Sequence, residues 1–175
     1  VIEYAGDLIS SLSVENRMTI CNMTIEGGAR AGLIEPDQKV FDYLKNKPMS
    51  PKNENWEKAL EYWNKLNSDD GAQIDKEIIL EGKDIKPMVT WGTSPQDVIT
   101  IDGKVPNPEN ESDQDKKNSI ERALNYMGLK PNMAATDIKI DKVFIGSCTN
   151  GRIEDLREAA KIVKDKKVSS HVNAI

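Results

Sequence analysis

One ten-residue stretch, Val-Phe-Ile-Gly-Ser-Cys-Thr-Asn-Gly-Arg at residues 143–152, constrains the fold of this chain more than any other. Residues 141–145 predict a short apolar strand, and residues 146–151 predict a tight turn. Apolar residues then recur at helical spacing over 153–164, which predicts a helix. Strand, turn and helix form the unit of an α/β fold, so we expect helices packed on a mainly parallel sheet.

The turn places a thiol, Cys148, at the carboxyl end of the predicted strand and at the start of the predicted helix. Ligands bind at such strand ends in open α/β sheets, and the positive end of a helix dipole favours a thiolate. The residues alone leave three interpretations open: a buried structural cysteine, a nucleophile, or a metal or cluster ligand. A nucleophile would need a base, and His171 is the single histidine of the chain. The turn is not a phosphate loop, because it lacks the Gly-Lys-Ser/Thr ending.

A second motif lies near the start of the chain, where residues 18–26 are mostly apolar. If this segment is helical, Asn22 and Glu26 are four residues apart and share a face, so an amide and a carboxylate project together. The alternative is that Glu26 lies at a helix end in solvent. Cys21 lies between helix-forming residues, and we interpret it as a small core residue. A third motif, the Gly-Thr-Ser-Pro turn at 92–95, offers hydroxyls and amides to a ligand, or is simply a satisfied turn.

Charge and composition exclude several classes of function. The chain of 175 residues carries a net charge of −5, and a uniformly acidic chain is a poor nucleic-acid binder. No apolar stretch approaches the ~20 residues of a membrane span, and no targeting segment is visible. The two cysteines lie 127 residues apart, which is not a disulfide framework. We therefore expect a cytoplasmic protein with no nucleic-acid or membrane partner.

The pattern along the chain predicts two folded parts and a linker. We expect an internal α/β domain over 1–102, an acidic, solvated linker over 103–118, and the start of a next α/β domain over 119–175. Because both ends have the character of mid-domain sequence, we also expect a piece of a longer protein. Further helices and strands are predicted within these parts. The helices are 38–45, 55–66 and 119–127, and the strands are 74–80, 87–92 and 98–101.

Taken in order, the motifs resemble the aconitase superfamily over essentially the whole chain. They are Thr-Ile-Cys-Asn-Met-Thr-Ile-Glu at 19–26 with Gly-Ala-Arg-Ala-Gly at 28–32, Val-Thr-Trp-Gly-Thr-Ser-Pro at 89–95, and Phe-Ile-Gly-Ser-Cys-Thr-Asn-Gly-Arg-Ile-Glu-Asp-Leu at 144–156. The Gly-Arg-Ile-Glu-Asp-Leu continuation is similar to the 3-isopropylmalate dehydratase large-subunit branch rather than to aconitase proper. The resemblance implies part of a three-layer α/β/α aconitase-like iron–sulfur domain.

The resemblance also implies a [4Fe–4S] cluster that is held by three cysteines, with one iron open to substrate. Cys148 matches the first of these ligands, and Glu26 matches the catalytic carboxylate near the open iron. Asn22, Ser147 and Asn150 match residues that neighbour the cluster. Such a site has a chemical reason, since removing a hydroxyl requires a Lewis acid and a group that moves a proton.

The implied activity is the interconversion of 2-isopropylmalate and 3-isopropylmalate by dehydration and rehydration in leucine biosynthesis. Its substrate is a 2-hydroxy dicarboxylate, and its partner is the small subunit of the dehydratase. The alternatives are a homoaconitase, a citraconate-type hydratase, a non-catalytic scaffold fragment, or an enzyme with a cysteine nucleophile. The family's Cys-x-x-Cys ligand pair is not among these residues, and one thiolate cannot hold a cluster. We therefore expect the isolated chain to be inactive and to lack a cluster.

Overall fold

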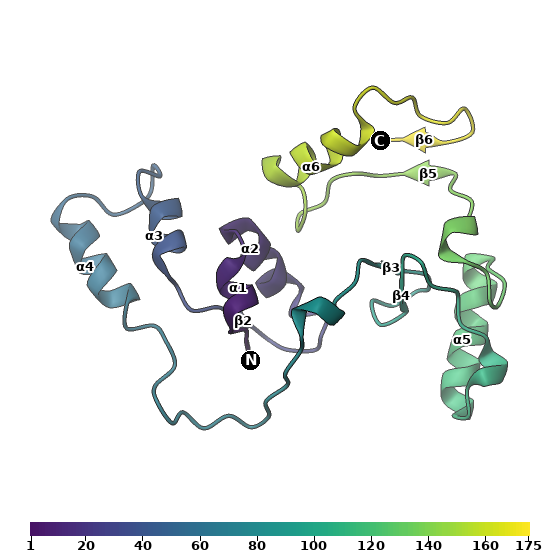
Figure 1. Cartoon of the computed structure of the whole chain (residues 1–175), viewed down its shortest axis with the longest axis horizontal. Helices are drawn as coiled ribbons and strands as arrows, with labels where there is room; N and C mark the ends of the chain where they lie inside the picture. Colours follow the sequence, from purple (N-terminus) through teal and green to yellow (C-terminus); the bar gives the residue numbers. More distant parts are fainter. The chain divides into compact units, whose positions relative to one another are not determined.

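The computed structural model describes all residues from 1 to 175 and shows a mixed α/β chain (Figure 1). Its strands form three two-stranded sheets, two of them parallel and one antiparallel. The chain divides into two compact units, which are described separately. Unit 1 comprises residues 1–78 and 144–167, and unit 2 comprises residues 79–143 and 168–175. The predicted α/β class is thus confirmed at the level of a mixed fold, and the three-layer arrangement stays a prediction.

Unit 1 contains a two-stranded parallel sheet and most of the helices. Strand β1 (Ile2–Glu3) pairs with β2 (Gly32–Leu33) so that Ile2 lies opposite Gly32. The helices are α1 (Asp7–Ser11), α2 (Val14–Met23), α3 (Gln38–Leu44), α4 (Glu54–Trp63) and α6 (Ile153–Val163). The three helices predicted at 38–45, 55–66 and 153–164 are therefore confirmed within a few residues at their ends.

Helix α2 packs closely on β2, and the sequence around Gly32 allows the close approach. Thr24, at the end of α2, is buried, and its hydroxyl lies 2.9 Å from the hydroxyl of Tyr4. A Cβ on Gly32 would overlap the Thr24 hydroxyl and would lie only 3.0 Å from the Cα of Cys21. Glycine is therefore required where β2 crosses the end of α2.

A buried arginine joins α2 to α3 inside unit 1. Arg17 is only 4% exposed, and its Nη2 donates to Asp37 Oδ2 over 2.6 Å and to the carbonyl oxygen of Ser10 over 2.8 Å. The Asp37 carboxylate also accepts the backbone N–H of Val40 and so caps the first turn of α3. The hydrogen bond from Arg17 holds the pKa of Asp37 below its usual range, against the opposing effect of burial. The ion pair and the helix cap thus share one carboxylate.

Aromatic side chains hold α3 against α4. The rings of Phe41 and Trp63 stack with their centroids 6.0 Å apart, and Trp56 meets Trp63 edge-on at 5.7 Å. Both geometries are favourable for aromatic pairs. The tryptophans of α4 are therefore packing residues.

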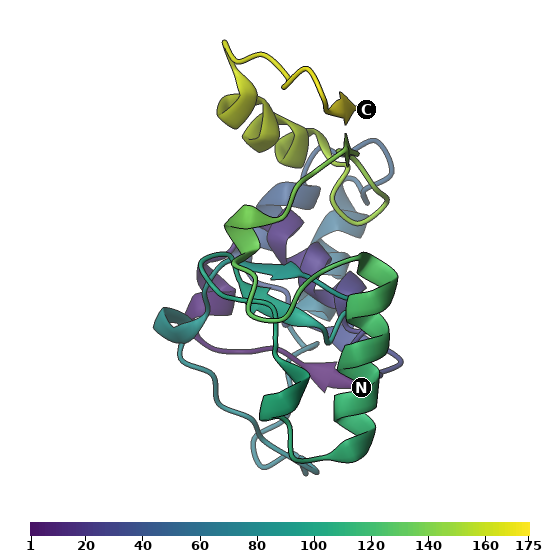
Figure 2. The ribbon, with the colours of Figure 1, turned by 90° about the vertical axis from the view of Figure 1, so that its right-hand side faces the viewer.

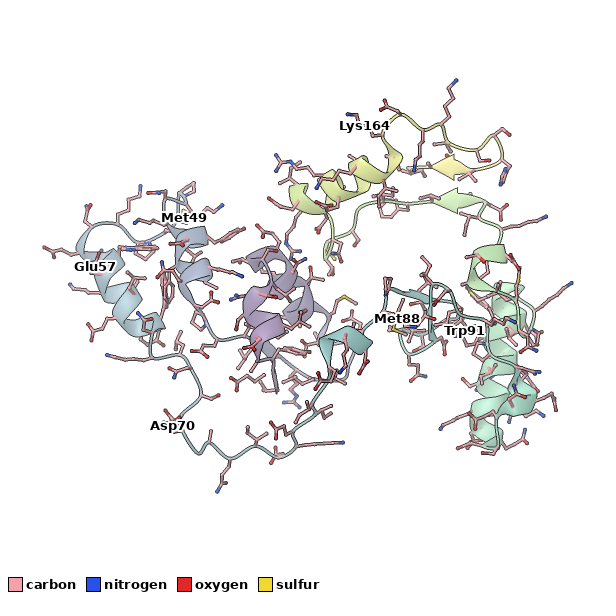
Figure 3. All side chains as sticks on the ribbon, viewed as in Figure 1. Met49, Glu57, Asp70, Met88, Trp91 and Lys164 are labelled. Carbon is pink, nitrogen blue, oxygen red and sulfur yellow. The ribbon has the colours of Figure 1, made fainter.

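Unit 2 is built from a hairpin and a long helix. Strand β3 (Met88–Thr90) pairs antiparallel with β4 (Val98–Thr100), and α5 (Gln114–Met127) runs beside this hairpin (Figure 2). Trp91 directly follows β3 and is 4% exposed. It lies between the hairpin and α5 (Figure 3). The core is completed by Val105, Ala123 and Leu124. The predicted strands at 87–92 and 98–101 are confirmed in position, although both are shorter.

The segment 103–118 is ordered, although its composition predicts a solvated linker. Val105 is 1% exposed, and its backbone N–H donates to the carbonyl oxygen of Met133 over 2.8 Å. Pro108 is buried in the 3₁₀ helix η2 (Pro108–Asn110), and α5 already begins at Gln114. Two apolar residues and a helix cap at Asp113 are enough to fix a segment that is otherwise polar. The division of the chain into domains at this segment stays a prediction.

Two strand predictions are corrected. Residues 74–80 form no strand, and their apolar side chains are exposed, since no neighbouring segment pairs with them. The strand predicted over 141–145 is reduced to β5 (Lys142–Val143), which pairs in parallel with β6 (Asn173–Ala174) in unit 2. The helix predicted over 119–127 ends as expected at Met127, and Gly128 after it takes the left-handed conformation with φ 68°. None of the helices combines the length and the apolar character that crossing a membrane requires.

Candidate functional site

The turn that carries Cys148 connects residue 145 to the start of α6, and its glycines set its shape. Gly146 has φ 119°, a backbone conformation that residues with a side chain rarely adopt. A Cβ on Gly151 would overlap the carbonyl oxygen of Ser147. The turn therefore closes tightly, and it leaves the side chains of Ser147, Cys148 and Asn150 exposed. Cys148 is a free, exposed thiol, so the interpretation as a buried structural cysteine is wrong.

The turn at 146–151 lies against α2, which carries the second motif. The amide nitrogen Nδ2 of Asn22 donates to Oγ1 of Thr149 over 3.1 Å. The guanidinium nitrogen Nη1 of Arg152 donates to the carbonyl oxygen of Thr149 over 2.7 Å and to Oγ1 of Thr19 over 3.1 Å. In Figure 1 the start of α6 accordingly lies beside α2. The structure thus brings two of the sequence motifs together, and it does so within unit 1.

Arg152 is a residue of this site that the motif analysis did not single out. It occupies the N-cap position of α6, and its backbone N–H donates to Asp155 Oδ2 over 3.1 Å. Its side chain is 23% exposed and its Nη1 lies 3.9 Å from the Asp155 carboxylate. A cation at a helix N-terminus is unfavourable, and Ser, Thr, Asp or Asn is the usual N-cap. This mismatch is the sequence signal that could have identified Arg152 as a residue with another task.

Cys21 lies on the opposite side of α2 from the contact with the turn. Thr19 and Asn22 are three residues apart and share the face that meets residues 146–151. Cys21 is instead half-buried where β2 approaches, with its Cα close to Gly32. Burial raises the pKa of the Cys21 thiol, which keeps it protonated at neutral pH. Cys21 is therefore a half-buried residue beside β2, and it does not belong to the core in which the sequence interpretation had placed it.

Glu26 is not on α2, since that helix ends at Met23. It lies in the following turn, where its N–H donates to the carbonyl oxygen of Met23 over 3.2 Å. Asn22 and Glu26 therefore do not share a helix face, and this prediction is wrong. The carboxylate is exposed and makes no hydrogen bond or ion pair in the structure, so it is accessible to a ligand.

The Gly-Thr-Ser-Pro turn belongs to unit 2 and is satisfied by its own chain. One oxygen of the Asp97 carboxylate accepts the backbone N–H groups of Thr93 and Ser94, each over 3.0 Å. A Cβ on Gly92 would overlap this carboxylate, so the glycine makes room for it. Because Asp97 already bonds these backbone N–H groups, the arrangement favours a turn that is satisfied by its own chain over a ligand site.

The chain matches the profile of the aconitase family (aconitate hydratase) over residues 1–175. It therefore belongs to the aconitase family. This membership gives the class of protein, a hydro-lyase type of enzyme.

The donor set of these residues does not by itself fit the [4Fe–4S] cluster that the family implies. The chain has two cysteines, of which only Cys148 is exposed, and no group of three or more His, Cys, Asp or Glu side chains comes together. Such clusters are held by several thiolates. The residues of this chain supply one exposed thiolate, which by itself does not hold a cluster.

Proposed function

We propose that this chain forms part of a hydro-lyase that interconverts 2-isopropylmalate and 3-isopropylmalate by dehydration and rehydration. The observation that carries the proposal is the contact between α2 and the turn 146–151, where Asn22 and Arg152 both bond Thr149. This contact joins two motifs of the aconitase family in one place. The Gly-Arg-Ile-Glu-Asp-Leu sequence at 151–156 resembles the isopropylmalate branch, and it also contains the arginine that makes the contact.

In this proposal the exposed side chains of the turn and of the segment at the end of α2 have distinct roles. Cys148 would be one thiolate ligand of the cluster, and the cluster would supply a Lewis acid once its remaining ligands are in place. Glu26 is the carboxylate that carries a proton to or from the substrate hydroxyl, and its exposure leaves it within reach of a ligand. Asn22, Ser147 and Asn150 supply polar groups beside Cys148. A dicarboxylate substrate and a separate small subunit complete the proposal.

The test uses the protein that contains this chain, produced together with its small subunit under anaerobic conditions with iron and sulfide. Alkene formation is followed with 2-isopropylmalate, homocitrate, citramalate and citrate as substrates. We expect the highest kcat/KM with 2-isopropylmalate, and no turnover by the isolated 175-residue chain. A preference for another of these acids would assign the protein to a different branch of the family.

Variants then separate the roles of individual residues. We expect Glu26→Gln to lower kcat by about 10²- to 10⁴-fold, as the loss of a general acid–base group does. Cys148→Ser should remove activity and the visible absorbance of the cluster together. Cys21→Ala is the matched control, since this half-buried thiol lies outside the turn 146–151, and it should retain both. If the activity did not require iron and were lost when iodoacetamide alkylates Cys148, the result would instead support a cysteine nucleophile.

A further inference from the structure

We propose that Arg152 is a positioning residue that fixes the Cys148 turn on α2. Its importance for turnover rests on the function proposed above, whereas the fixing of the turn can be tested separately. One guanidinium nitrogen bonds both segments, Thr19 Oγ1 on α2 and the carbonyl oxygen of Thr149 in the turn. The other side-chain hydrogen bond between these two segments is that of Asn22 to Thr149.

The surroundings of Arg152 make this contact effective. Its side chain is 23% exposed, so water competes less for these bonds than at an open surface. The guanidinium is planar and has several donors in a fixed arrangement, which a lysine ammonium does not reproduce. The arginine is thus suited to hold two acceptors that belong to different segments.

The position of Arg152 in α6 shows that helix formation alone does not explain it. The positive end of the helix dipole repels a cation, and a Ser or Asp would be the better N-cap. Asp155 offsets the repulsion, with its carboxylate 3.9 Å from Nη1 and 3.1 Å from the backbone nitrogen of Arg152. The contacts to Thr19 and Thr149 account for the presence of the cation at this point.

The consequence concerns the residue beside the thiol. Thr149 directly follows Cys148, and it is held at two atoms, its hydroxyl by Asn22 and its carbonyl oxygen by Arg152. The backbone at Cys148 is therefore fixed relative to the helix face that carries Asn22. A catalytic group must be held in such a fixed geometry, since a displacement of about 1 Å can lower the rate about 10²-fold.

The first experiment measures the turn in the 175-residue chain. Arg152→Ala, Arg152→Lys and the parent are compared by hydrogen–deuterium exchange of the amides at 147–151. Alkylation of Cys148 by iodoacetamide is measured in the same samples, with Cys21 as the internal reference. Arg157→Ala is the matched control, because it removes an exposed guanidinium from the same helix.

We expect Arg152→Ala to raise both the amide exchange and the Cys148 alkylation rate about threefold to tenfold, the range of one lost hydrogen bond. Arg152→Lys should give an intermediate increase, and Arg157→Ala should match the parent. If Arg152→Ala does not fold, as judged by circular dichroism, the increase in Arg152→Lys decides the question. In that case, the proposal would be overturned if Arg152→Lys had the same amide exchange and alkylation rates as the parent. If Arg152→Ala does fold, the same rates in Arg152→Ala and the parent would overturn it.

The second experiment uses the assembled enzyme that contains the chain. We expect Arg152→Ala to lower kcat by about 10- to 100-fold while KM changes little, with Arg152→Lys restoring part of kcat. A changed KM with unchanged kcat would overturn the positioning role. If the parent enzyme shows no hydro-lyase activity while the turn still loosens in Arg152→Ala, the proposed function fails and the fixing of the turn stands.

Discussion

The side-chain amide of Asn22 and the hydroxyl of Thr149 are hydrogen-bonded over 3.1 Å, although 127 residues separate them in the chain. Asn22 lies on α2, and Thr149 lies in the turn before α6. This bond and the bonds of Arg152 bring together segments that are distant in sequence. The geometry of the candidate site therefore depends on a few polar contacts rather than on a hydrophobic core.

The bond between Asn22 and Thr149 can be removed without disturbing Arg152, which bonds the carbonyl oxygen of Thr149. Thr149→Val keeps the shape of the side chain and removes the acceptor, and Thr149→Ser keeps the hydroxyl as a control. We expect Thr149→Val to destabilise the contact by about 0.5–1.5 kcal/mol, the usual net value of one hydrogen bond. Hydrogen exchange at amides 147–151 measures this change. Identical exchange in the serine and valine variants would show that the hydroxyl does not hold the turn.

The two cysteines should differ in reactivity toward iodoacetamide. Cys148 is exposed, whereas Cys21 is half-buried, and burial raises the pKa of its thiol. Because the thiolate is the reactive form, Cys21 should react several-fold more slowly in the folded chain at pH 8. Mass spectrometry of the two peptides measures both rates, and unfolding in urea is the control that should bring them close together. Faster labelling of Cys21 in the folded chain would contradict its placement against β2.

The ion pair between Arg17 and Asp37 should make the stability of unit 1 depend on pH. The hydrogen bond from Arg17 lowers the pKa of Asp37 in the folded state below its value in the unfolded chain, about 4. Such a carboxylate stabilises the fold above pH ~4, and this contribution is lost as the pH falls through the lowered pKa. The parent should therefore lose more stability between pH 5 and pH 2.5 than Asp37→Asn does.

Asp37→Asn should also be less stable at pH 7, by about 1–3 kcal/mol, because Arg17 then remains buried without an anion. Urea unfolding at pH 7 and at low pH measures both effects. Asp42→Asn is the control, since that carboxylate is exposed on the same helix and should cost well under 1 kcal/mol. An equal loss in the two variants would show that the Arg17 contact does not stabilise the fold.

Sequence periodicity predicted α3, α4 and α5 well, because apolar side chains recur on one face of each helix. Trp56 and Trp63 of α4 are an example, since both meet the aromatic cluster with Phe41. The same reasoning failed at residues 74–80, whose apolar character is that of a strand. A strand needs a partner for its hydrogen bonds, and pairing is a property of the tertiary structure that one segment does not reveal.

The candidate site was predicted in part. The turn around Cys148 was identifiable from its glycines and its place between an apolar segment and a helix. The mismatch of Arg152 with its N-cap position was a local sign of another task, but its partner Thr19 is 133 residues distant and no local pattern indicates such a pair. The prediction that Asn22 and Glu26 share a helix face was also wrong, since the end of α2 depends on the packing of Thr24 against Gly32.

One buried side chain anchors the acidic segment 103–118 to the core of unit 2. Val105 is 1% exposed and contacts the core that contains Trp91 and Leu124. We expect Val105→Ala to destabilise unit 2 by about 1–2.5 kcal/mol, through lost burial and the cavity that remains. Val98→Ala is the matched control, because Val98 is 39% exposed and should cost less than about 1 kcal/mol.

Hydrogen exchange at the amides of Ala123 and Leu124 in α5 reports the stability of unit 2 independently of unit 1. Since both residues belong to the core cluster with Val105, their exchange should accelerate about 5- to 50-fold in Val105→Ala and much less in Val98→Ala. A solvated linker predicts a different result. In that case the two valines would be equivalent, both exchange rates would stay near that of the parent, and the composition of the segment would describe its state correctly.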